Sequence, residues 1–154
     1  MPERFSEALR DIEVAVASEG KPRERLGRVV EIIRRANPLH SWVGIYYLRG
    51  SLLELGPFSG ISTVHTRIPV GTGVCGTAVR ERRNQLVNDV RQCDNYLSCS
   101  EAVQSELVVL IWRNHTILGV IDIDSDEIEA FGHKHEQDLE QVAKVIAPLV
   151  FEVL

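Results

Sequence analysis

Three acidic residues in the second half of the chain could act together on a small charged molecule. Asp122 and Asp124 stand two residues apart in Ile121-Asp122-Ile123-Asp124-Ser125, so on a strand both side chains point to one face of the sheet. Glu106 begins another apolar segment, and it would lie near Asp124 if the two segments paired as a hairpin. Crowded carboxylates raise one another's pKa, so such a set could bind an ammonium group and supply a proton. A solvated polar face with ordinary alternation is an equally good interpretation.

The three cysteines are candidate nucleophiles. Cys75 stands in the turn from Gly71 to Gly76, which opens a short helix, and the positive end of a helix dipole lowers a thiol pKa and favours the thiolate. Cys99 lies in an irregular polar loop, where it is either a reactive thiol or an incidental small residue. With Cys93 the count is odd and low, and no export signal is visible, so we expect a cytoplasmic protein without a disulfide framework.

Two other kinds of site fit the sequence poorly. The turn from Gly71 to Gly76 has G-x-G-x-x-G spacing, but the parallel βαβ unit and the ribose-binding acid of a dinucleotide site are missing. No Cys-x-x-Cys pair exists, and the histidines that could complete a zinc site are scattered. These are His65, His115, His133 and His135. We therefore expect no bound metal and no dinucleotide.

Length and composition limit the class of protein. A chain of 154 residues with 44% hydrophobic and 25% charged residues predicts a single globular domain, residues 1–154. The net charge of −5 argues against nonspecific binding of nucleic acid. The longest apolar run, from Leu107 to Trp112, is too short to cross a membrane, so we expect no membrane association.

The apolar spacing assigns elements that would position these residues. It predicts two helices within residues 1–37, over 4–18 and 22–36, and a closing helix after Phe131 that Pro148 kinks or divides. It predicts strands over 42–48, 52–55, 67–70, 85–87, 105–112 and 116–125, with a short helix from the glycine turn to residue 82. Residues 88–104 show no regular period.

This order of elements predicts an α+β fold. We expect a mostly antiparallel central sheet with the N- and C-terminal helices on one face and a loop-covered pocket on the other. Residues 1–37 would pack on the sheet, and residues 42–154 would form the pocket-bearing core and the C-terminal helix.

A succession of short motifs runs through the strand-rich part of the chain. In order they are Trp42-Val43-Gly44-Ile45-Tyr46, Leu55-Gly56-Pro57-Phe58-Ser59-Gly60, R-I-P-V-G-T-G-V-C-G-T-A from Arg67 to Ala78, Asp89-Val90, Cys99, Ser105-Glu106-Leu107-Val108-Val109, Gly119-Val120-Ile121-Asp122-Ile123-Asp124-Ser125 and Phe131. The succession resembles the free methionine-(R)-sulfoxide reductases, which are single GAF domains. The combination is far more specific than the glycines that GAF domains share in general.

The resemblance implies a role for each matching residue. The attacking cysteine of the family matches Cys99, and a second family cysteine matches Cys75. The substrate carboxylates of the family match Glu106, Asp122 and Asp124, and its aromatic wall matches Trp42 and Tyr46.

The sequence departs from the family pattern at two places. Members commonly hold a third cysteine just before the R-I-P-V strand, where this chain has Val64-His65-Thr66. The loop text His-Ile-Ala-Cys-Asp is replaced by Tyr96-Leu97-Ser98-Cys99-Ser100. Without the third thiol, either Cys75 or the additional Cys93 would resolve the sulfenic acid, or an external thiol would reduce it directly.

The implied reaction reduces free methionine-(R)-sulfoxide to methionine through a thiol, a sulfenic acid and a disulfide. The Cys99 thiolate would attack the sulfoxide sulfur while Glu106 or Asp124 donates a proton to the oxygen. The reaction needs no metal or organic cofactor, and a dithiol reductant such as thioredoxin would reopen the disulfide.

A non-catalytic interpretation stands beside the enzymatic one. GAF domains also serve as small-ligand sensors and as dimerisation modules, and the terminal helices could support a homodimer. A sensor usually travels with an output domain, and these 154 residues contain none.

Overall fold

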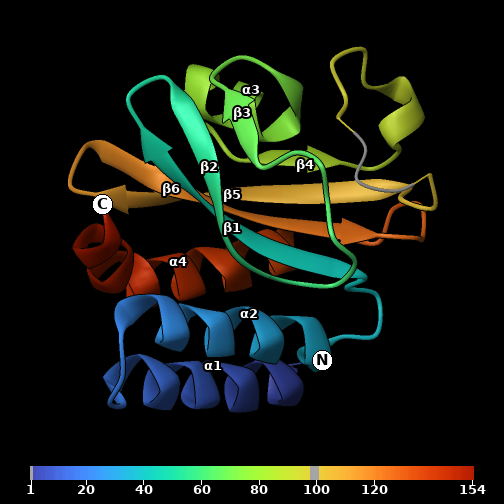
Figure 1. Ribbon diagram of the computed structural model, residues 1–154. Helices are drawn as coiled ribbons and strands as arrows, with labels where there is room; N and C mark the ends of the chain where they lie inside the picture. Colours follow the sequence, from blue (N-terminus) through green and yellow to red (C-terminus); the bar gives the residue numbers. More distant parts are fainter. Residues whose placement is uncertain (1, 98–100) are drawn as a thin grey trace.

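The computed structural model describes residues 2–97 and 101–154, which are arranged around a six-stranded antiparallel sheet (Figure 1). The strand order is β3-β2-β1-β6-β5-β4. The helices are α1 (Pro2–Ala17), α2 (Pro22–Ala36), α3 (Gly73–Glu81) and α4 (His133–Val153), with a short 3-10 helix η1 (Val90–Gln92). The strands are β1 (Trp42–Arg49), β2 (Leu52–Ser59), β3 (Arg67–Pro69), β4 (Gln85–Val87), β5 (Ser105–Arg113) and β6 (Thr116–Ser125).

The two faces of the sheet have different covers. Helices α2 and α4 pack directly on one face, which we call the helix face, and α1 packs on both of them (Figure 1). Helix α3 lies on the opposite side, which we call the pocket face. Ile121 and Ile123 of β6 belong to the core of the helix face, as the alternation of apolar and acidic residues predicts. The predicted α+β architecture, with terminal helices gathered on one face, is confirmed.

Most predicted boundaries agree with the structure to within two residues, but strand β2 and helix α4 differ more. Strand β2 continues to Ser59, past Gly56 and Pro57, because a register shift in β1 between Gly44 and Tyr46 absorbs the irregular segment. Helix α4 runs unbroken from His133 to Val153 with Pro148 inside it, so of the two predicted effects of this proline, a kink or a division, the division is wrong. Burial of the neighbouring Leu149 and Val150 against the core holds this helix together across the proline.

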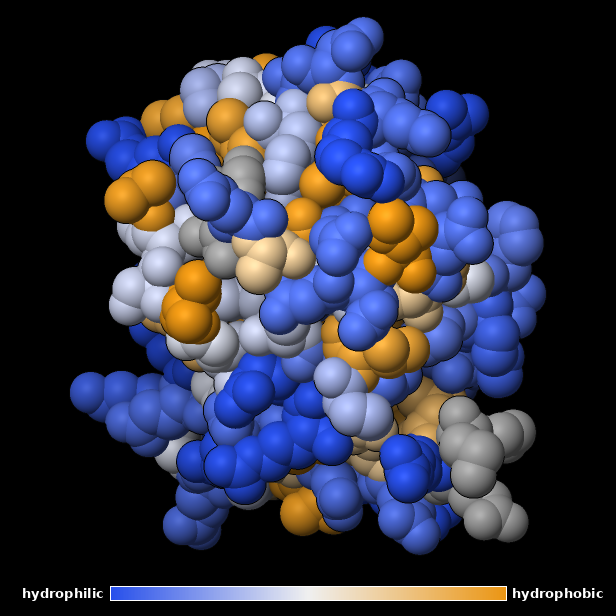
Figure 2. All heavy atoms as spheres, turned by 90° about the vertical axis from the view of Figure 1, so that its right-hand side faces the viewer, coloured by the Kyte–Doolittle hydropathy of each residue, from blue (hydrophilic) through white to orange (hydrophobic). Residues whose placement is uncertain are grey.

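The end of the molecule on the right of Figure 1 is shown face-on in Figure 2. Its surface is largely hydrophilic, and hydrophobic residues form small separate clusters on it. Among the described residues, none of the helices has the length and apolar character that crossing a lipid bilayer requires.

A glycine in β6 allows the sheet to close around the aromatic residues of β1. Gly119 is the neighbour of Tyr47 in the β1–β6 pairing, and a Cβ atom built on it would collide with the backbone oxygen of Tyr46. Backbone atoms of a central strand cannot move aside without breaking the ladder on both sides. Position 119 therefore requires glycine for steric reasons.

The substitution Gly119→Ala should destabilise the protein by about 3 kcal/mol, the upper end of the usual cost of overpacking, because the added atom meets backbone that cannot move aside. Gly132→Ala is the matched control, since a Cβ atom there meets nothing within 4 Å. Urea unfolding followed by circular dichroism measures both. A Gly119→Ala protein as stable as Gly132→Ala would show that the close approach is not real.

A buried histidine links α2, β1 and α4. His40 is 7% exposed, and its Nδ1 donates a hydrogen bond to the backbone oxygen of Ile33 at 2.8 Å. Its Nε2 is buried and has no hydrogen-bond partner in the part of the chain that the structure describes. Burial lowers the pKa of His40 from 6.5 to about 4, and the nearby His135 adds to the effect. The folded protein therefore keeps this ring neutral.

The low pKa of His40 predicts acid sensitivity. The pKa of His40 is lower in the folded protein than in the unfolded chain. The neutral ring therefore contributes a free energy of folding that is fully present above pH 6.5 and is lost as the pH falls through 4. The full difference is about 3 kcal/mol, from about 1.4 kcal/mol per pKa unit. When the pH is lowered from 7 to 4, the free energy of unfolding of the wild type should fall by about 3 kcal/mol more than that of His40→Gln. The exposed His133→Gln should follow the wild type, and equal losses in all three proteins would contradict the assignment.

Candidate active site

Three buried carboxyl groups lie side by side on the pocket face. Glu106 of β5 stands opposite Asp124 of β6, as the hairpin arrangement predicts, and Asp122 stands opposite Val108. The exposed fractions are 4% for Glu106, 4% for Asp122 and 1% for Asp124. This degree of burial excludes the solvated polar face, because ionisable groups are rarely buried unless they have a structural or chemical role.

The glycine turn brings a thiol onto these carboxyl groups. Cys75 is the third residue of α3, and Gly71 and Gly73 before it have φ angles of 94° and 65° that favour glycine. Gly76 lets the turn fold tightly, because a Cβ atom there would lie 2.6 Å from the backbone oxygen of Pro69. One ligand atom from each of Cys75, Glu106 and Asp122 lies within 4.8 Å of the others.

The surroundings of Cys75 raise the pKa of its thiol, whereas its position at the start of a helix predicted a lowered pKa. Burial is the largest cause that raises the pKa of Cys75 well above its ordinary value, and the charges of Asp122, Glu106 and Asp124 raise it further. The expectation of a stabilised thiolate at Cys75 is therefore wrong. The partial charge of a helix terminus is small beside burial next to carboxylates.

Burial also changes the pKa of the carboxyl group of Asp122. Desolvation raises the pKa of Asp122, while hydrogen bonds with Glu106 and Cys75 act in the opposite direction. A carboxyl group with a raised pKa holds a proton at higher pH than an exposed one does. The raised pKa of Asp122 thus comes from burial, and not from the mutual repulsion that was predicted for crowded carboxylates.

Two aromatic residues of β1 tie the β2–β3 connection to the site. Trp42 Nε1 donates a hydrogen bond to the backbone oxygen of Ile61 at 2.9 Å, and the Trp42 ring stacks on Phe58 with centroids 5.8 Å apart. The Tyr46 hydroxyl donates to the backbone oxygen of His65 at 2.8 Å. Both predicted wall residues are thus buried on the pocket face and hold the neighbouring connection in place.

A small cavity marks where these groups meet. It is lined by Tyr46, His65, Ile68, Gly73, Val74, Cys75, Leu97, Glu106 and Asp122. Four of the predicted site residues are among them, while Trp42 and Asp124 lie beside the cavity as neighbours in the β1–β6 pairing. His65 and Leu97 were not predicted as site residues. The position of His65, two residues before the R-I-P-V strand, was the available signal, and Leu97 carries none.

The other two predicted cysteines differ in what the structure shows of them. Cys99 lies outside the described residues. Cys93 follows η1, is partly buried and packs against the apolar cluster that contains Cys75, but it does not line the cavity. Cys75 and Cys93 are both free thiols.

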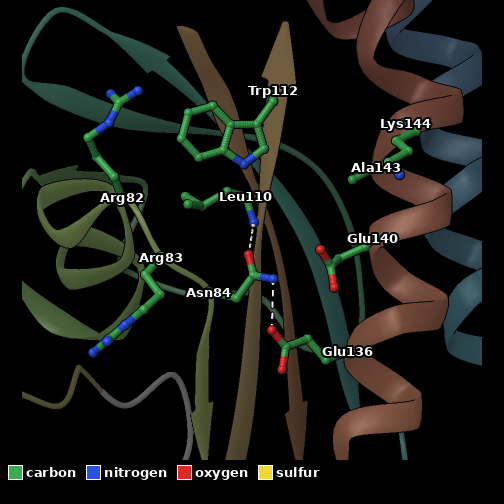
Figure 3. Close-up of a pocket in the computed structure, with 9 residues that line it drawn as sticks. All are labelled: Arg82, Arg83, Asn84, Leu110, Trp112, Glu136, Glu140, Ala143 and Lys144. Carbon is green, nitrogen blue, oxygen red and sulfur yellow. Dashed lines mark hydrogen bonds between the residues drawn. The ribbon is translucent and has the colours of Figure 1, made fainter. Parts of the chain in front are cut away.

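A larger hollow elsewhere on the protein has no thiol among its lining residues. It has a volume of about 300 Å³ and lies between the end of α3, the edge of β5 and helix α4 (Figure 3). Asn84 spans it, accepting a hydrogen bond from the Leu110 N–H at 2.8 Å and donating to Glu136 at 2.9 Å. Figure 3 shows the Arg82 and Arg83 side chains pointing away from Glu136 and Glu140. No cysteine lines this hollow, so the buried carboxyl cluster remains the candidate site.

Comparisons with known proteins identify relatives of this chain. The pattern of the GAF domain family matches residues 21–150. The free methionine-R-sulfoxide reductase of Escherichia coli is 35% identical over 140 residues, which are 91% of this chain and 84% of that protein.

Two solved structures agree with this result. The type II free methionine-R-sulfoxide reductase from Thermoplasma acidophilum is 36% identical with a TM-score of 0.83, covering 85% of this chain and 93% of that one. The free methionine-R-sulfoxide reductase from Neisseria meningitidis, solved in complex with its substrate, is 31% identical with a TM-score of 0.89, covering 96% and 88%.

The contrast between the two described cysteines can be measured directly. In the native protein, iodoacetamide should alkylate Cys75 at least about tenfold more slowly than Cys93, because Cys75 is buried and each unit of raised pKa removes about nine-tenths of the thiolate. Peptide mass spectrometry at timed intervals gives both rates. In urea the two rates should converge. Equal rates in the native protein would mean that Cys75 is not enclosed by the carboxyl groups.

Proposed function

Because the chain belongs to the GAF domain family and is homologous to the free methionine-R-sulfoxide reductases, we propose that it reduces free methionine-(R)-sulfoxide to methionine. The observation that carries the proposal is the convergence of a thiol and two carboxyl groups on one small cavity, Cys75 with Glu106 and Asp122. A thiol provides redox chemistry, and buried carboxyl groups provide both charge and protons.

The lining of the cavity, rather than its volume of about 10 Å³, has the chemistry that suits a small zwitterion with an uncharged tail. The ammonium group of a free amino acid would pair with the carboxylates, which offsets the cost of burying them together. The apolar and aromatic side of the site, with Tyr46 in the cavity wall and Trp42 beside it, would contact the thioether end. A sulfur atom next to an aromatic ring makes a favourable contact.

Chemistry begins when the Cys99 thiolate attacks the sulfoxide sulfur. This attack forms a bond between the two sulfur atoms. The oxygen then passes to the Cys99 sulfur as the S–O bond of the substrate and the new sulfur–sulfur bond break, so that methionine leaves with a neutral thioether and Cys99 becomes a sulfenic acid. The sulfoxide sulfur is reduced by two electrons, and the cysteine sulfur is oxidised by two. One proton is taken up at the oxygen, and we assign its delivery to Glu106 or Asp124.

The buried carboxyl environment favours this proton delivery. Oxygen is a poor leaving group unless it is protonated, and an exposed carboxylic acid is almost fully ionised at neutral pH. Burial of Glu106 and Asp124 next to Asp122, whose pKa is raised, supports retention of a shared proton by the cluster. Three carboxyl groups can therefore bind a cation and still act as an acid.

The last step returns Cys99 to its thiol. Either Cys75 or Cys93 would condense with the sulfenic acid, with loss of water, and a dithiol reductant such as thioredoxin would then reduce the disulfide. The raised pKa of Cys75 makes it a slow nucleophile in the resting site. Direct reduction of the sulfenic acid by an external thiol is the third route.

Replacement of Cys99 by Ser should abolish both the first turnover and thioredoxin-coupled NADPH consumption. The measurement is methionine formed per protein after mixing with excess methionine-(R)-sulfoxide, with and without the reducing system. Cys75→Ser and Cys93→Ser are the matched variants, and each should still form about one equivalent of methionine without reductant. The variant that lacks the resolving thiol should lose repeated turnover.

Two outcomes would contradict the proposal. Normal turnover by Cys99→Ser would show that another group is the nucleophile. Wild-type protein that binds the sulfoxide and leaves it unchanged would instead favour a non-catalytic ligand sensor, the other role that GAF domains serve.

A further inference from the structure

The group formed by Cys75, Glu106 and Asp122 has the composition of a metal site as well as that of a substrate site. A thiol sulfur and two carboxyl oxygens, one from each residue, all lie within 4.8 Å of one another. The three residues are at most 4% exposed. We propose that this group, here called the thiol–carboxylate cluster, binds a thiophilic divalent cation such as Zn²⁺ and that the ion blocks the cavity.

A second observation points to a ligand at the same place. Asp122 is only 4% exposed, and its buried Oδ1 atom has no hydrogen-bond partner among the described residues. Asp122 also lines the cavity. A buried carboxylate oxygen without a donor is costly, because it has lost its water and gained nothing in exchange. A cation bound there would compensate for that loss.

The distances suit a four-coordinate ion. Zinc lies about 2.3 Å from thiolate sulfur and about 2.0–2.2 Å from carboxylate oxygen, so its ligand atoms stand roughly 3–4 Å apart. The three atoms of the thiol–carboxylate cluster are within 4.8 Å, so small side-chain movements bring them onto a common centre. An open zinc site has three protein ligands and a fourth coordination position that faces the cavity, and the thiol–carboxylate cluster has this arrangement.

The donor set selects the kind of ion. A thiolate favours Zn²⁺ and Co²⁺, whereas Mg²⁺ and Ca²⁺ prefer sites made of oxygen alone. No lysine or arginine lines the cavity among the described residues, so no resident cation opposes the entry of a metal ion. Asp124 lies buried beside Glu106 and is a further acidic group behind the ligands. The acidic surroundings and the donor chemistry therefore agree.

Binding exchanges protons for the metal ion. The S–H bond of Cys75 breaks, its proton and the proton shared by the carboxyl groups leave to solvent, and one sulfur–metal and two oxygen–metal bonds form without oxidation or reduction of any atom. The ion would sit between the carboxylates, at the place assigned above to the substrate ammonium group. The claim that the ion competes with substrate therefore rests on the proposed function, whereas the claim that the ion binds does not.

Cobalt titration tests the binding directly. Co²⁺ added to the wild-type protein should produce the thiolate-to-cobalt absorption in the near ultraviolet, and Zn²⁺ should displace it. Cys75→Ser should lose the absorption and weaken Zn²⁺ binding at least about tenfold, as expected for loss of a direct ligand. Cys93→Ser, which changes a thiol outside the cavity, should keep both. If Cys75→Ser fails to fold, Asp122→Asn should show the same tenfold loss of affinity.

Two results would overturn the metal site. One is a wild-type dissociation constant for Zn²⁺ weaker than about 1 mM, which corresponds to only about 4 kcal/mol of binding. The other is unchanged cobalt absorption in Cys75→Ser, which would place the ion on another thiol.

Activity measurements separate this inference from the proposed function. Zn²⁺ should raise the KM for methionine-(R)-sulfoxide without changing kcat, and EDTA should restore the original KM. If the protein binds Zn²⁺ at Cys75 but forms no methionine under any condition, the metal site stands and the proposed function fails. If it forms methionine and Zn²⁺ at saturation has no effect on KM, the claim that the ion blocks the cavity is wrong.

Discussion

The pairing of β5 with β6 is the interaction on which the rest of the site depends. It places Glu106 opposite Asp124 in the antiparallel ladder, and the same ladder sets Asp122 on the same face two residues away. A slip of one residue would turn all of one strand's carboxyl groups toward the apolar helix face. Ile121 and Ile123 prevent that slip, because they would lose their place in the core. The hydrophobic core therefore determines where the acidic groups lie.

Burial of several acids in one place is unfavourable for folding, and the surroundings show how that cost is limited. Asp122 shares hydrogen bonds with Glu106 and Cys75, so part of its lost hydration is replaced. The sheet beneath is a close-packed antiparallel ladder in which even a Cβ at Gly119 has no room. A site of this kind can be kept only by a rigid scaffold, since mobile walls would let water in and let the charges separate.

Much of this arrangement could be predicted from the residues. The two-residue spacing of Asp122 and Asp124 predicted their common face, and the hairpin predicted the position of Glu106, because both follow from the geometry of strands. The environment of Cys75 could not be predicted in this way. Its helix position indicated a lowered pKa, but the effect of three carboxyl groups depends on contacts between α3, β5 and β6 that no local pattern encodes. The same holds for Leu97, which enters the cavity from an irregular segment.

The β2–β3 connection is held to β1 through its main chain. Trp42 and Tyr46 donate to the backbone oxygens of Ile61 and His65, and every amino acid carries such an oxygen. The path of this connection therefore does not depend on which side chains it bears at those two positions. An imidazole can occupy position 65, where related proteins were expected to carry a thiol, while the backbone keeps its anchorage. The wall of the cavity can thus exchange one reactive group for another over evolutionary time without rebuilding the fold that supports it.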